Sequence, residues 1–553
     1  MKKILSILLI LTGIYSYGQS ELTSGYFNYH LTDRYEIMSD SLPTHLFSSV
    51  KPYRRDIVSD FTEPIRTLST ADKFNQRYLL NDNVLYNKEV SNFRTQPILS
   101  HFYKTQSALF LVQEDNFNLV VNPLLGFAGG TESQDTLPIY RNSRGIEIRG
   151  NIGNKVGFYS SAIENQVQYP SFLRQKHATT GVVDGTTLHK KFGDADAAQD
   201  YFNATGYITF SPIKEIAVQF GQDKNFIGNG YRSLILSDFS APYPFLKINT
   251  QVWKFNYQNL FSQHIDFITQ DESANNGRKF SAFHHLSMNI GKNVNIGLFE
   301  NIIFDRSDSS MSNRYELAYL NPIIFYRAVE HGLNSSDNAV LGLDWKWNFL
   351  KRFSFYGQFI LDEFVKDEVF GRTESWVNKW GYQAGLKYIN VANVNNLDLQ
   401  LEVNQVRPYV YQHRSKAQNW IHYNQSLAHP LGANLRELVA IVRYQPANRF
   451  NINAVYSLSK QGIDTSLLST NFGGNYLRTY SDGLVDPAPL FQGIENTIST
   501  MSIDASYMLW HNLFLDAGIF IRNQSNMLIN QDKKNMIFRF GMRLNLASLD
   551  YRY

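Results

Sequence analysis

The side chains best suited to chemistry gather in two stretches, residues 221–248 and 407–434, where aromatic rings stand beside carboxylate, guanidinium and imidazole groups. Such mixtures suit a sugar site, because rings stack on the C–H faces of a sugar while polar groups hold its hydroxyls. The candidate carbohydrate-binding residues in these stretches are Asp223, Arg232, Tyr243, Tyr409, Tyr411, His413, Trp420 and His429, and Asp344 on the predicted strand 338–349 is a ninth candidate. The alternative has equal weight: these Pro-, Gly- and aromatic-rich stretches fold into a cavity and plug it, and a plug can also bind.

Motifs for catalysis are sparse. The sequence contains no nucleophile elbow, phosphate loop, dinucleotide fingerprint or paired-His zinc motif. The nearest candidates, His284-His285 and Asp362-Glu363, have no spacing that assigns them a role, and a lumen-lining polar network is the simpler interpretation. The sequence contains no Cys, which excludes disulfides, a lipoprotein anchor and thiolate metal ligands. We therefore predict a protein that is not an enzyme, with no catalytic residue, metal or cofactor.

The stretch 397–406 shows which elements must position these groups. Leu397, Leu399, Leu401 and Val403 alternate with polar residues, so a strand here has one aliphatic face and one polar face. A soluble sandwich would turn the aliphatic face inward, whereas a membrane barrel turns it toward lipid.

The same alternation recurs along the chain from about residue 115. The clearest predicted strands are 144–152, 155–165, 215–221, 338–349, 353–362, 380–388, 397–406, 435–444, 451–459, 502–510, 513–522 and 536–546. The connections between them alternate short and long, as in outer-membrane barrels. The short ones are 152–154, 211–214, 258–263, 291–293, 350–352, 391–395, 446–449 and 511–512, and the long ones include 167–201, 222–250, 305–338, 363–379, 407–434 and 460–496. We predict an all-β, antiparallel transmembrane outer-membrane barrel of about eighteen strands.

The N-terminus divides into two segments. Residues 1–18 have a basic start, a short apolar run and a small-residue exit, which predicts a cleaved signal peptide and export to the outer membrane. Residues 19–107 are not strand-like and are assigned to a small periplasmic region, with short helices expected at 54–68 and 79–90. Residues 108–553 form the barrel, whose long external loops partly plug the lumen. The net charge of +3 indicates no nucleic-acid partner.

Two positions break the pattern. Glu300 shares the parity of Ile296 and Leu298, which points a carboxylate toward lipid, so we expect a bulge or a strand end near the outer rim. Tyr551 falls on the opposite parity from the preceding strand, which means either a bulge or a strand that stops near Ala547.

Several short motifs, in order, carry a resemblance. They are Gly228–Ser237 followed by Ala241-Pro242-Tyr243-Pro244, then Glu300, Asn321-Pro322, Asn338 with Gly342-Leu343-Asp344, Tyr356-Gly357-Gln358 with Asp362, Arg407-Pro408 with Tyr411-Gln412-His413, and His429-Pro430-Leu431-Gly432. Over residues 115–443 this arrangement resembles the capsule-assembly Wzi family. Where that family tends to have Trp and paired Pro in the first motif, this chain has Phe226 and Tyr243, which leaves the glycan open.

The resemblance implies an eighteen-stranded outer-membrane barrel with a small periplasmic helical part. It also implies a non-enzymatic surface lectin whose partners are capsular or exopolysaccharide and outer-membrane lipid or lipopolysaccharide. An alternative is a gliding-motility or adhesion component that works through gliding or surface-export proteins. A pore or an outer-membrane enzyme is the third alternative.

Overall fold

The computed structural model describes residues 19–23, 28–65, 69–87, 102–153, 155–193, 197–267, 276–306, 314–325, 337–363, 374–464, 470–526, 529–548 and 550–551. The predicted signal peptide lies outside the described residues. Within the described part, no helix has the length and apolar character to cross a membrane.

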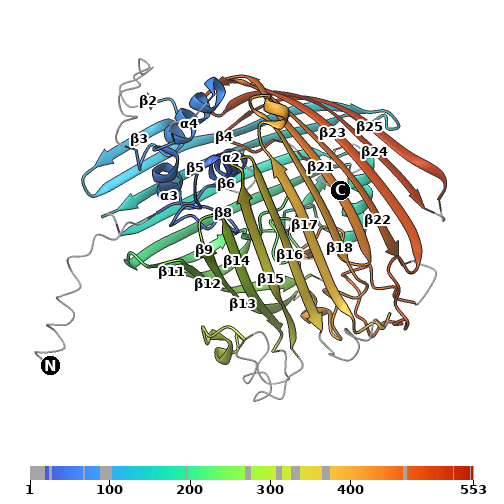
Figure 1. The fold of residues 1–553 in the computed structure, drawn as a ribbon. Coiled ribbons are helices and arrows are strands. Elements are labelled where there is room, and N and C mark those ends of the chain that lie inside the picture. Colours follow the sequence, from blue (N-terminus) through green and yellow to red (C-terminus); the bar gives the residue numbers. More distant parts are fainter. Residues whose placement is uncertain are drawn as a thin grey trace, which may run out of the picture.

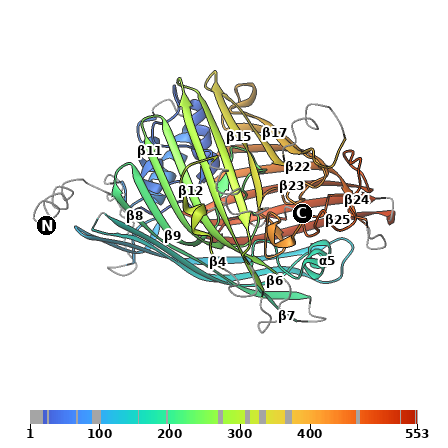
Figure 2. The same ribbon diagram turned by 90° about the horizontal axis from the view of Figure 1, so that it is seen from below.

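Eighteen described strands form one closed antiparallel barrel, which confirms the predicted fold (Figures 1 and 2). The barrel closes where β25 pairs with β4, for example at Leu544 opposite Leu125. Its strands are β4 Phe117–Glu132, β5 Ile139–Ile152, β6 Val156–Gln168, β8 Ala198–Ile213, β9 Ile216–Asp223, β11 Tyr243–Val252, β12 Phe255–Asp266, β13 Gly277–Ile290, β14 Val294–Phe304, β15 Asn338–Phe349, β16 Phe353–Glu363, β17 Lys379–Tyr388, β18 Leu397–Val406, β21 Leu435–Ala447, β22 Phe450–Ile463, β23 Ile494–Trp510, β24 Leu513–Asn526 and β25 Ile529–Leu544.

Strand β18 shows how alternation becomes a barrel wall. Its polar residues Asp398, Gln400 and Glu402 are at most 4% exposed, whereas Leu401 between them is 41% exposed on the outer surface. Other outward residues behave alike, with Phe220 at 67% and Phe540 at 63%. A water-soluble sandwich would bury these aliphatic and aromatic faces. The exposed apolar belt instead suits lipid, and the polar face lines the lumen.

The predicted order of short and long connections is confirmed, with one displaced turn. The β11–β12 connection is the two-residue turn at 253–254, where Val252 pairs with Phe255, and not the predicted segment 258–263. The turn lacks Asn-Gly or Gly-Gly, and Trp253 itself adopts the left-handed conformation with φ +55°. No local turn signal therefore marks this position in the sequence.

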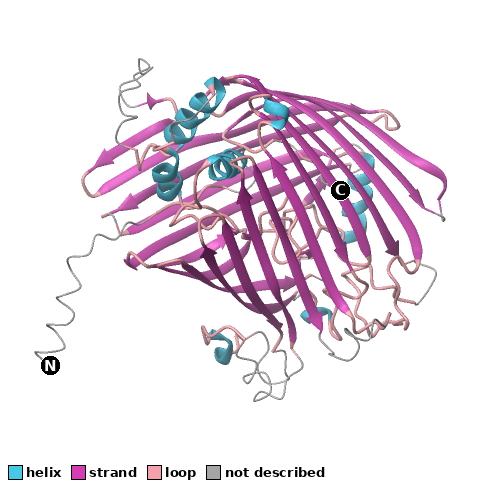
Figure 3. Cartoon of the chain, viewed as in Figure 1, coloured by secondary structure: helices cyan, strands magenta, loops and turns pink. Residues whose placement is uncertain are grey.

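The N-terminal helices lie at the barrel end that carries the short turns (Figures 1 and 3). They are α2 Asn28–Met38, α3 Arg55–Thr62 and α4 Thr70–Asp82. The predicted helix 54–68 contains α3, but the predicted helix 79–90 is misplaced, because α4 begins at Thr70. A capping box between Ser69 and Asp72 fixes that start. Helix α2 was not predicted, since it buries polar Asn28, Arg34 and Glu36 along with apolar residues and so shows no amphipathic pattern.

Smaller elements complete the chain. In front of β4, the strands β2 Phe102–Thr105 and β3 Ala108–Glu114 form a hairpin that pairs with the first half of β4. The long connections hold α5 Ser171–Thr180, β7 Lys190–Phe192, β10 Phe226–Ile227, η4 Leu317–Leu320, η6 Lys416–Gln418, β19 Ile421–His422 and β20 Gln425–Ser426. The strand β1 Val50–Lys51 lies in the N-terminal region, and η5 Val391–Asn393 lies in the β17–β18 turn.

Glu300 does face outward, but the predicted bulge or strand end is wrong. The pairing of β14 with β13 and with β15 runs through Glu300 without a register shift. Instead, the segment 314–325 packs over the outside of the wall, where Tyr319 joins an apolar cluster with Phe304 and Ile302. The backbone N–H of Phe325 donates a 2.7 Å hydrogen bond to the Glu300 carboxylate. A distant loop therefore shields the charge, which the local sequence could not reveal.

The C-terminal strand stops at Leu544, earlier than the predicted 536–546. Asn545 adopts φ +53°, and its side-chain amide donates to the Pro123 carbonyl at 2.9 Å. Tyr551 is 2% exposed and packs edge-on against Phe520, at a centroid distance of 5.7 Å, in an apolar cluster with Leu173 of α5. The parity break thus marks a tail that turns into the lumen.

Charged side chains hold the N-terminal helices to the wall. Arg34 of α2 is 1% exposed and contacts Asp72 of α4 at 2.8 Å and Asp398 of β18 at 2.5 Å. Burial disfavours the charge on Asp72, but Arg34 outweighs it and holds the pKa of that carboxyl below its usual value. A further buried pair joins Glu36 to Lys346 of β15, and a half-buried pair joins Asp33 to Lys387 of β17. Together these contacts place the helices as an inner plug.

We expect Arg34→Ala to destabilise the folded protein by about 3–5 kcal/mol, because two buried carboxylates lose their cation. The midpoint temperature of the gel-mobility shift that reports barrel unfolding measures this. The control is Lys214→Ala, which removes a 77%-exposed lysine paired with Glu215 and should cost less than about 1 kcal/mol. An unchanged midpoint for Arg34→Ala would contradict the anchoring role.

The topology predicts which ends of the barrel face the medium. Because the chain has no Cys, Ser481→Cys and Lys292→Cys each introduce a single thiol. Both positions are exposed, the first in the long β22–β23 loop and the second in the β13–β14 turn. We expect a membrane-impermeant maleimide to label Ser481→Cys on intact cells, and Lys292→Cys only after the outer membrane is opened. The opposite labelling pattern would mean that the barrel has the reverse orientation in the membrane.

Candidate functional site

The segment 224–242 leaves the wall after β9 and crosses the lumen before β11 begins. Its strand β10 pairs with β1 of the N-terminal region, so this outer connection meets the inner plug. Gly228 makes the close approach possible: its φ is +138°, and a Cβ there would lie 2.3 Å from Nε2 of Gln358 on β16. The segment 224–242 is called the plug loop below.

A second connection, residues 407–434, fastens onto the plug loop. The Tyr411 hydroxyl donates to the Leu234 carbonyl at 2.7 Å, and the Trp420 indole N–H donates to the Ile235 carbonyl at 3.0 Å. The Tyr409 hydroxyl donates at 2.7 Å to the carbonyl of Asn471 in the β22–β23 connection. All three aromatic side chains are at most 2% exposed. Their hydrogen bonds hold three long connections together.

Buried charges fix the plug loop to the wall. Arg232 contacts Glu437 of β21 at 3.1 Å, and His429 contacts the same carboxylate at 2.8 Å. The carboxylate of Glu402 accepts the backbone N–H groups of Tyr231 at 2.7 Å and Arg232 at 3.0 Å. Several donors satisfy the hydrogen-bonding capacity of each buried carboxylate. Loss of one donor would destabilise the fold, because a buried negative charge would lack a partner. These inward charges of β18 and β21 therefore position the loop.

The remaining predicted site residues lie apart from these contacts of the plug loop. Tyr243 begins β11, is 1% exposed and packs edge-on against His264 at 4.8 Å. Asp344 on β15 is fully buried and bonds His285 at 2.6 Å. Asp223 ends β9, half-buried, and accepts the backbone N–H of Lys224 at 2.8 Å. His413 is 6% exposed and belongs to the connection 407–434. The structure thus gives the predicted residues positioning contacts, and their glycan-binding role stays a prediction.

An aromatic cluster that the sequence analysis did not select lies beside His413 in the outer connections. Trp376 and Tyr480 are half-buried, with ring centroids 5.0 Å apart and planes tilted by 44°. Lys379 Nζ lies 4.4 Å from the Tyr480 centroid and 2.9 Å from Glu363. The His413 ring packs edge-on against Tyr480 at 5.7 Å, and burial together with Lys379 lowers the pKa of its imidazole, which stays neutral. We call these five residues the outer cluster.

Sequence reasoning missed Trp376 and Tyr480 because neither belongs to a recognisable motif. The available signal was topological, since both lie in connections predicted to be long and external. The structure joins two connections that are about a hundred residues apart in sequence. Within the described residues, no group of three or more His, Asp or Glu side chains could hold a metal ion.

The family model of the capsule assembly protein Wzi matches residues 140–536, well over half of the chain. The protein belongs to the Wzi family. The solved structure of Escherichia coli Wzi, an outer-membrane protein involved in group 1 capsule assembly and a carbohydrate-binding β-barrel, superimposes with a TM-score of 0.57 at 13% identity. The superposition covers 96% of this chain and 100% of that one, and it shows the shared fold.

A second barrel, Pseudomonas aeruginosa OprD, has a TM-score of 0.44 at 10% identity, and the match covers 82% of this chain and 96% of that one. No curated protein matches the chain. The Wzi family and the closed barrel place the protein in the outer membrane.

The plug loop should control the permeability of this Wzi barrel. An eighteen-stranded barrel is wide enough for an aqueous channel unless segments fill it. We expect replacement of residues 229–240 by a Gly-Ser linker of equal length to raise single-channel conductance in planar bilayers by about tenfold or more. The same replacement of residues 314–325, which lie on the outside of the wall, is the control and should leave conductance unchanged. A folded plug-loop variant with unchanged conductance would show that other segments occlude the lumen.

Proposed function

We propose that this Wzi-family protein binds capsular or exopolysaccharide at the cell surface and retains it there without catalysing a reaction. The observation that carries the proposal is the outer cluster, a half-buried pair of rings beside a cation at the outer end of a barrel crossed by its own loops. The shared fold of E. coli Wzi, which is a carbohydrate-binding barrel of capsule assembly, supports the same function. The basic start and apolar run of residues 1–18 support export through a cleaved signal peptide.

The chemistry of the outer cluster suits a sugar. The faces of Trp376 and Tyr480 offer apolar area at low conformational cost, because each ring has only two side-chain torsions. Lys379 contacts both rings, with Nζ 5.3 Å from the Trp376 centroid, and so holds them in place. Glu363 and His413 add a charged acceptor and a neutral imidazole beside the rings. Stacking with flanking hydrogen bonds is a binding arrangement and supplies no reaction by itself.

The nine residues chosen from the sequence enter this proposal mainly as supports. Tyr409 bonds the connection that carries Tyr480, and Tyr411 and Trp420 hold residues 407–434 on the plug loop. His413 is itself a member of the outer cluster, where its ring packs on Tyr480. Arg232 and His429 share Glu437 below them. Loss of a support should therefore weaken glycan retention by displacing the loops.

We expect the double variant Trp376→Ala, Tyr480→Ala to lose most surface-retained polysaccharide while the polymer is still made and released. Truncating one central ring typically costs about 2 kcal/mol, more than tenfold in affinity. Cell-bound and released polysaccharide are measured after gentle washing, and purified variants are tested for polymer binding. Trp253→Ala is the matched control, because Trp253 is 69% exposed in the β11–β12 turn at the opposite end.

Two results would contradict the proposal. Normal retention by a correctly folded double variant would remove the outer cluster from glycan binding. A deletion strain with normal retention but defective surface spreading would favour the alternative, a gliding or adhesion component that acts through protein partners.

A further inference from the structure

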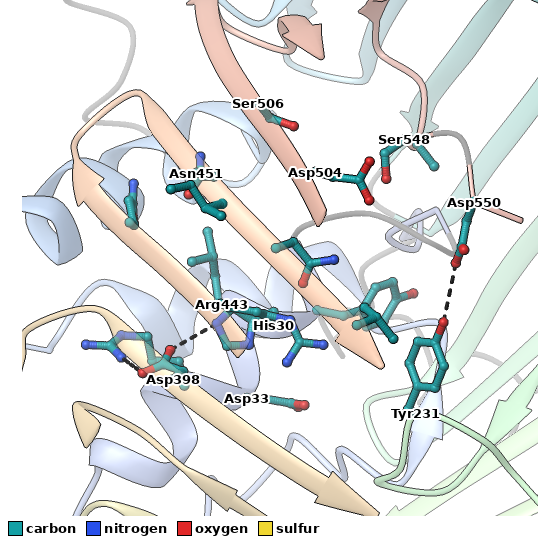
Figure 4. A pocket seen from close by; sticks show the side chains of 18 of the residues that line it. His30, Asp33, Tyr231, Asp398, Arg443, Asn451, Asp504, Ser506, Ser548 and Asp550 are labelled. Atoms are coloured by element: carbon teal, nitrogen blue, oxygen red, sulfur yellow. Dashed lines mark hydrogen bonds and ion pairs between the residues drawn. The ribbon is translucent and has the colours of Figure 1, made fainter. Parts of the chain in front are cut away.

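A chamber of about 330 Å³ remains inside the barrel between the inner plug and the plug loop (Figure 4). Its wall is formed by β18, β21, β22 and β23, and α2 contributes His30 and Asp33. Tyr231 of the plug loop and Ser548 of the C-terminal tail close two further sides. These segments are far apart in the sequence, so the chamber exists only once both plugs and the tail are docked.

Arg443 of β21 points into this chamber (Figure 4). Its guanidinium donates from Nη1 to the side-chain oxygen of Gln400 at 3.2 Å. Within the described part of the chain, no carboxylate oxygen lies within the 4.0 Å that defines an ion pair with Arg443. A guanidinium has five N–H donors in a planar fork, so most of this capacity remains for a ligand.

The acids near Arg443 already have cations of their own. Asp398 contacts Arg34 at 2.5 Å and His30 at 3.1 Å. Asp33 contacts Lys387 at 2.5 Å, and Asp504 pairs with Arg539. These three carboxylates therefore complete pairs of their own, which leaves the fork of Arg443 available in the chamber.

A second cation lines the same chamber, and no ion pair joins it to a carboxylate of the described residues. Lys51 of β1 donates a 2.7 Å hydrogen bond to the Gly228 carbonyl and lies 4.8 Å from the Phe226 ring centroid. Burial, its largest influence, lowers the pKa of its ammonium to about 8, so it is mostly charged at neutral pH. Lys51 adds positive charge to the side formed by the plug loop.

The lining also contains Asp238 and Asp550, and Asp550 accepts a 3.5 Å hydrogen bond from the Tyr231 hydroxyl. Its other groups include neutral hydrogen-bonding side chains. Asn451, Asn453 and Ser502 lie on β22 and β23, and Ser548 lies on the tail. Tyr231 presents a ring whose other face is covered by the Arg232 guanidinium at 4.7 Å. Amides, hydroxyls and a ring are the partners of a hydroxylated molecule, whereas an apolar ligand would leave them unsatisfied.

We propose that the chamber is a binding site for a small hydroxyl-rich carboxylate, an acidic monosaccharide unit, whose carboxylate pairs with Arg443. The site is separate from the outer cluster and does not depend on it. A guanidinium binds a carboxylate through two parallel N–H···O bonds, and this geometry selects a carboxylate over a neutral sugar. The chamber volume lies at the lower end of the range for small-molecule sites, which suits one sugar unit.

The test uses the full-length folded protein in detergent, with isothermal titration of D-glucuronate, D-glucose and inorganic phosphate. We expect glucuronate to bind at least tenfold more tightly than glucose or phosphate. Arg443→Gln should weaken glucuronate binding at least tenfold. Arg522→Gln is the matched control and should bind as the wild type, because Arg522 is an inward arginine 4.8 Å from the Phe172 ring and outside the chamber.

Ser548→Phe provides a second route, because it fills the chamber from the tail without altering a barrel strand. It should also abolish glucuronate binding while the heat-dependent gel shift shows an intact barrel. The proposal is overturned if the wild type does not bind glucuronate, if phosphate binds as tightly, or if folded Arg443→Gln and Ser548→Phe bind it unchanged. Polymer retention by Arg443→Gln should be normal, which separates this site from the outer cluster.

Discussion

The fold depends on the opposite environments of the two faces of each strand. Outside, apolar side chains such as Leu401 and Phe540 face lipid, which imposes no hydrogen-bonding demand. Inside, the same strands carry carboxylates, amides and amines that need partners in a narrow space. Glu402 and Asp398 of β18 show the consequence, because one accepts the plug loop and the other accepts helix α2. The wall of the barrel thus specifies what fills it.

This demand connects the two ends of the molecule. The inner plug and the plug loop meet through the β1–β10 pair, so the helices and the outer connections form one continuous filling. Tyr411 and Trp420 extend it outward to residues 407–434, and Tyr409 extends it to the connection that carries Tyr480. A sugar bound at the outer cluster would therefore rest on a rigid support and not on free loops, which lowers the entropic cost of binding.

Much of the fold could be predicted from the sequence, because period-two alternation and connection length are local signals. They predict the barrel, the strand number and the order of short and long connections. Helix α2, the cover over Glu300 and the inward tail could not be predicted, since each depends on contacts with distant residues. The site shows the same division. The residue types in 407–434 were recognised, but the burial of Tyr411 depends on Leu234 and Asp362, and the meeting of Trp376 with Tyr480 depends on two unrelated connections.

Lipid contact tests the inside-out arrangement most directly. Variants that keep one of the seven Trp residues are reconstituted in bilayers with brominated acyl chains, which quench indole fluorescence on contact. Trp347 of β15 is 48% exposed on the outer face, and Trp420 is 2% exposed within the filling. The structure predicts strong quenching of the variant that keeps only Trp347 and little quenching of the one that keeps only Trp420. Equal or reversed quenching would contradict an apolar outer wall around a polar, filled lumen.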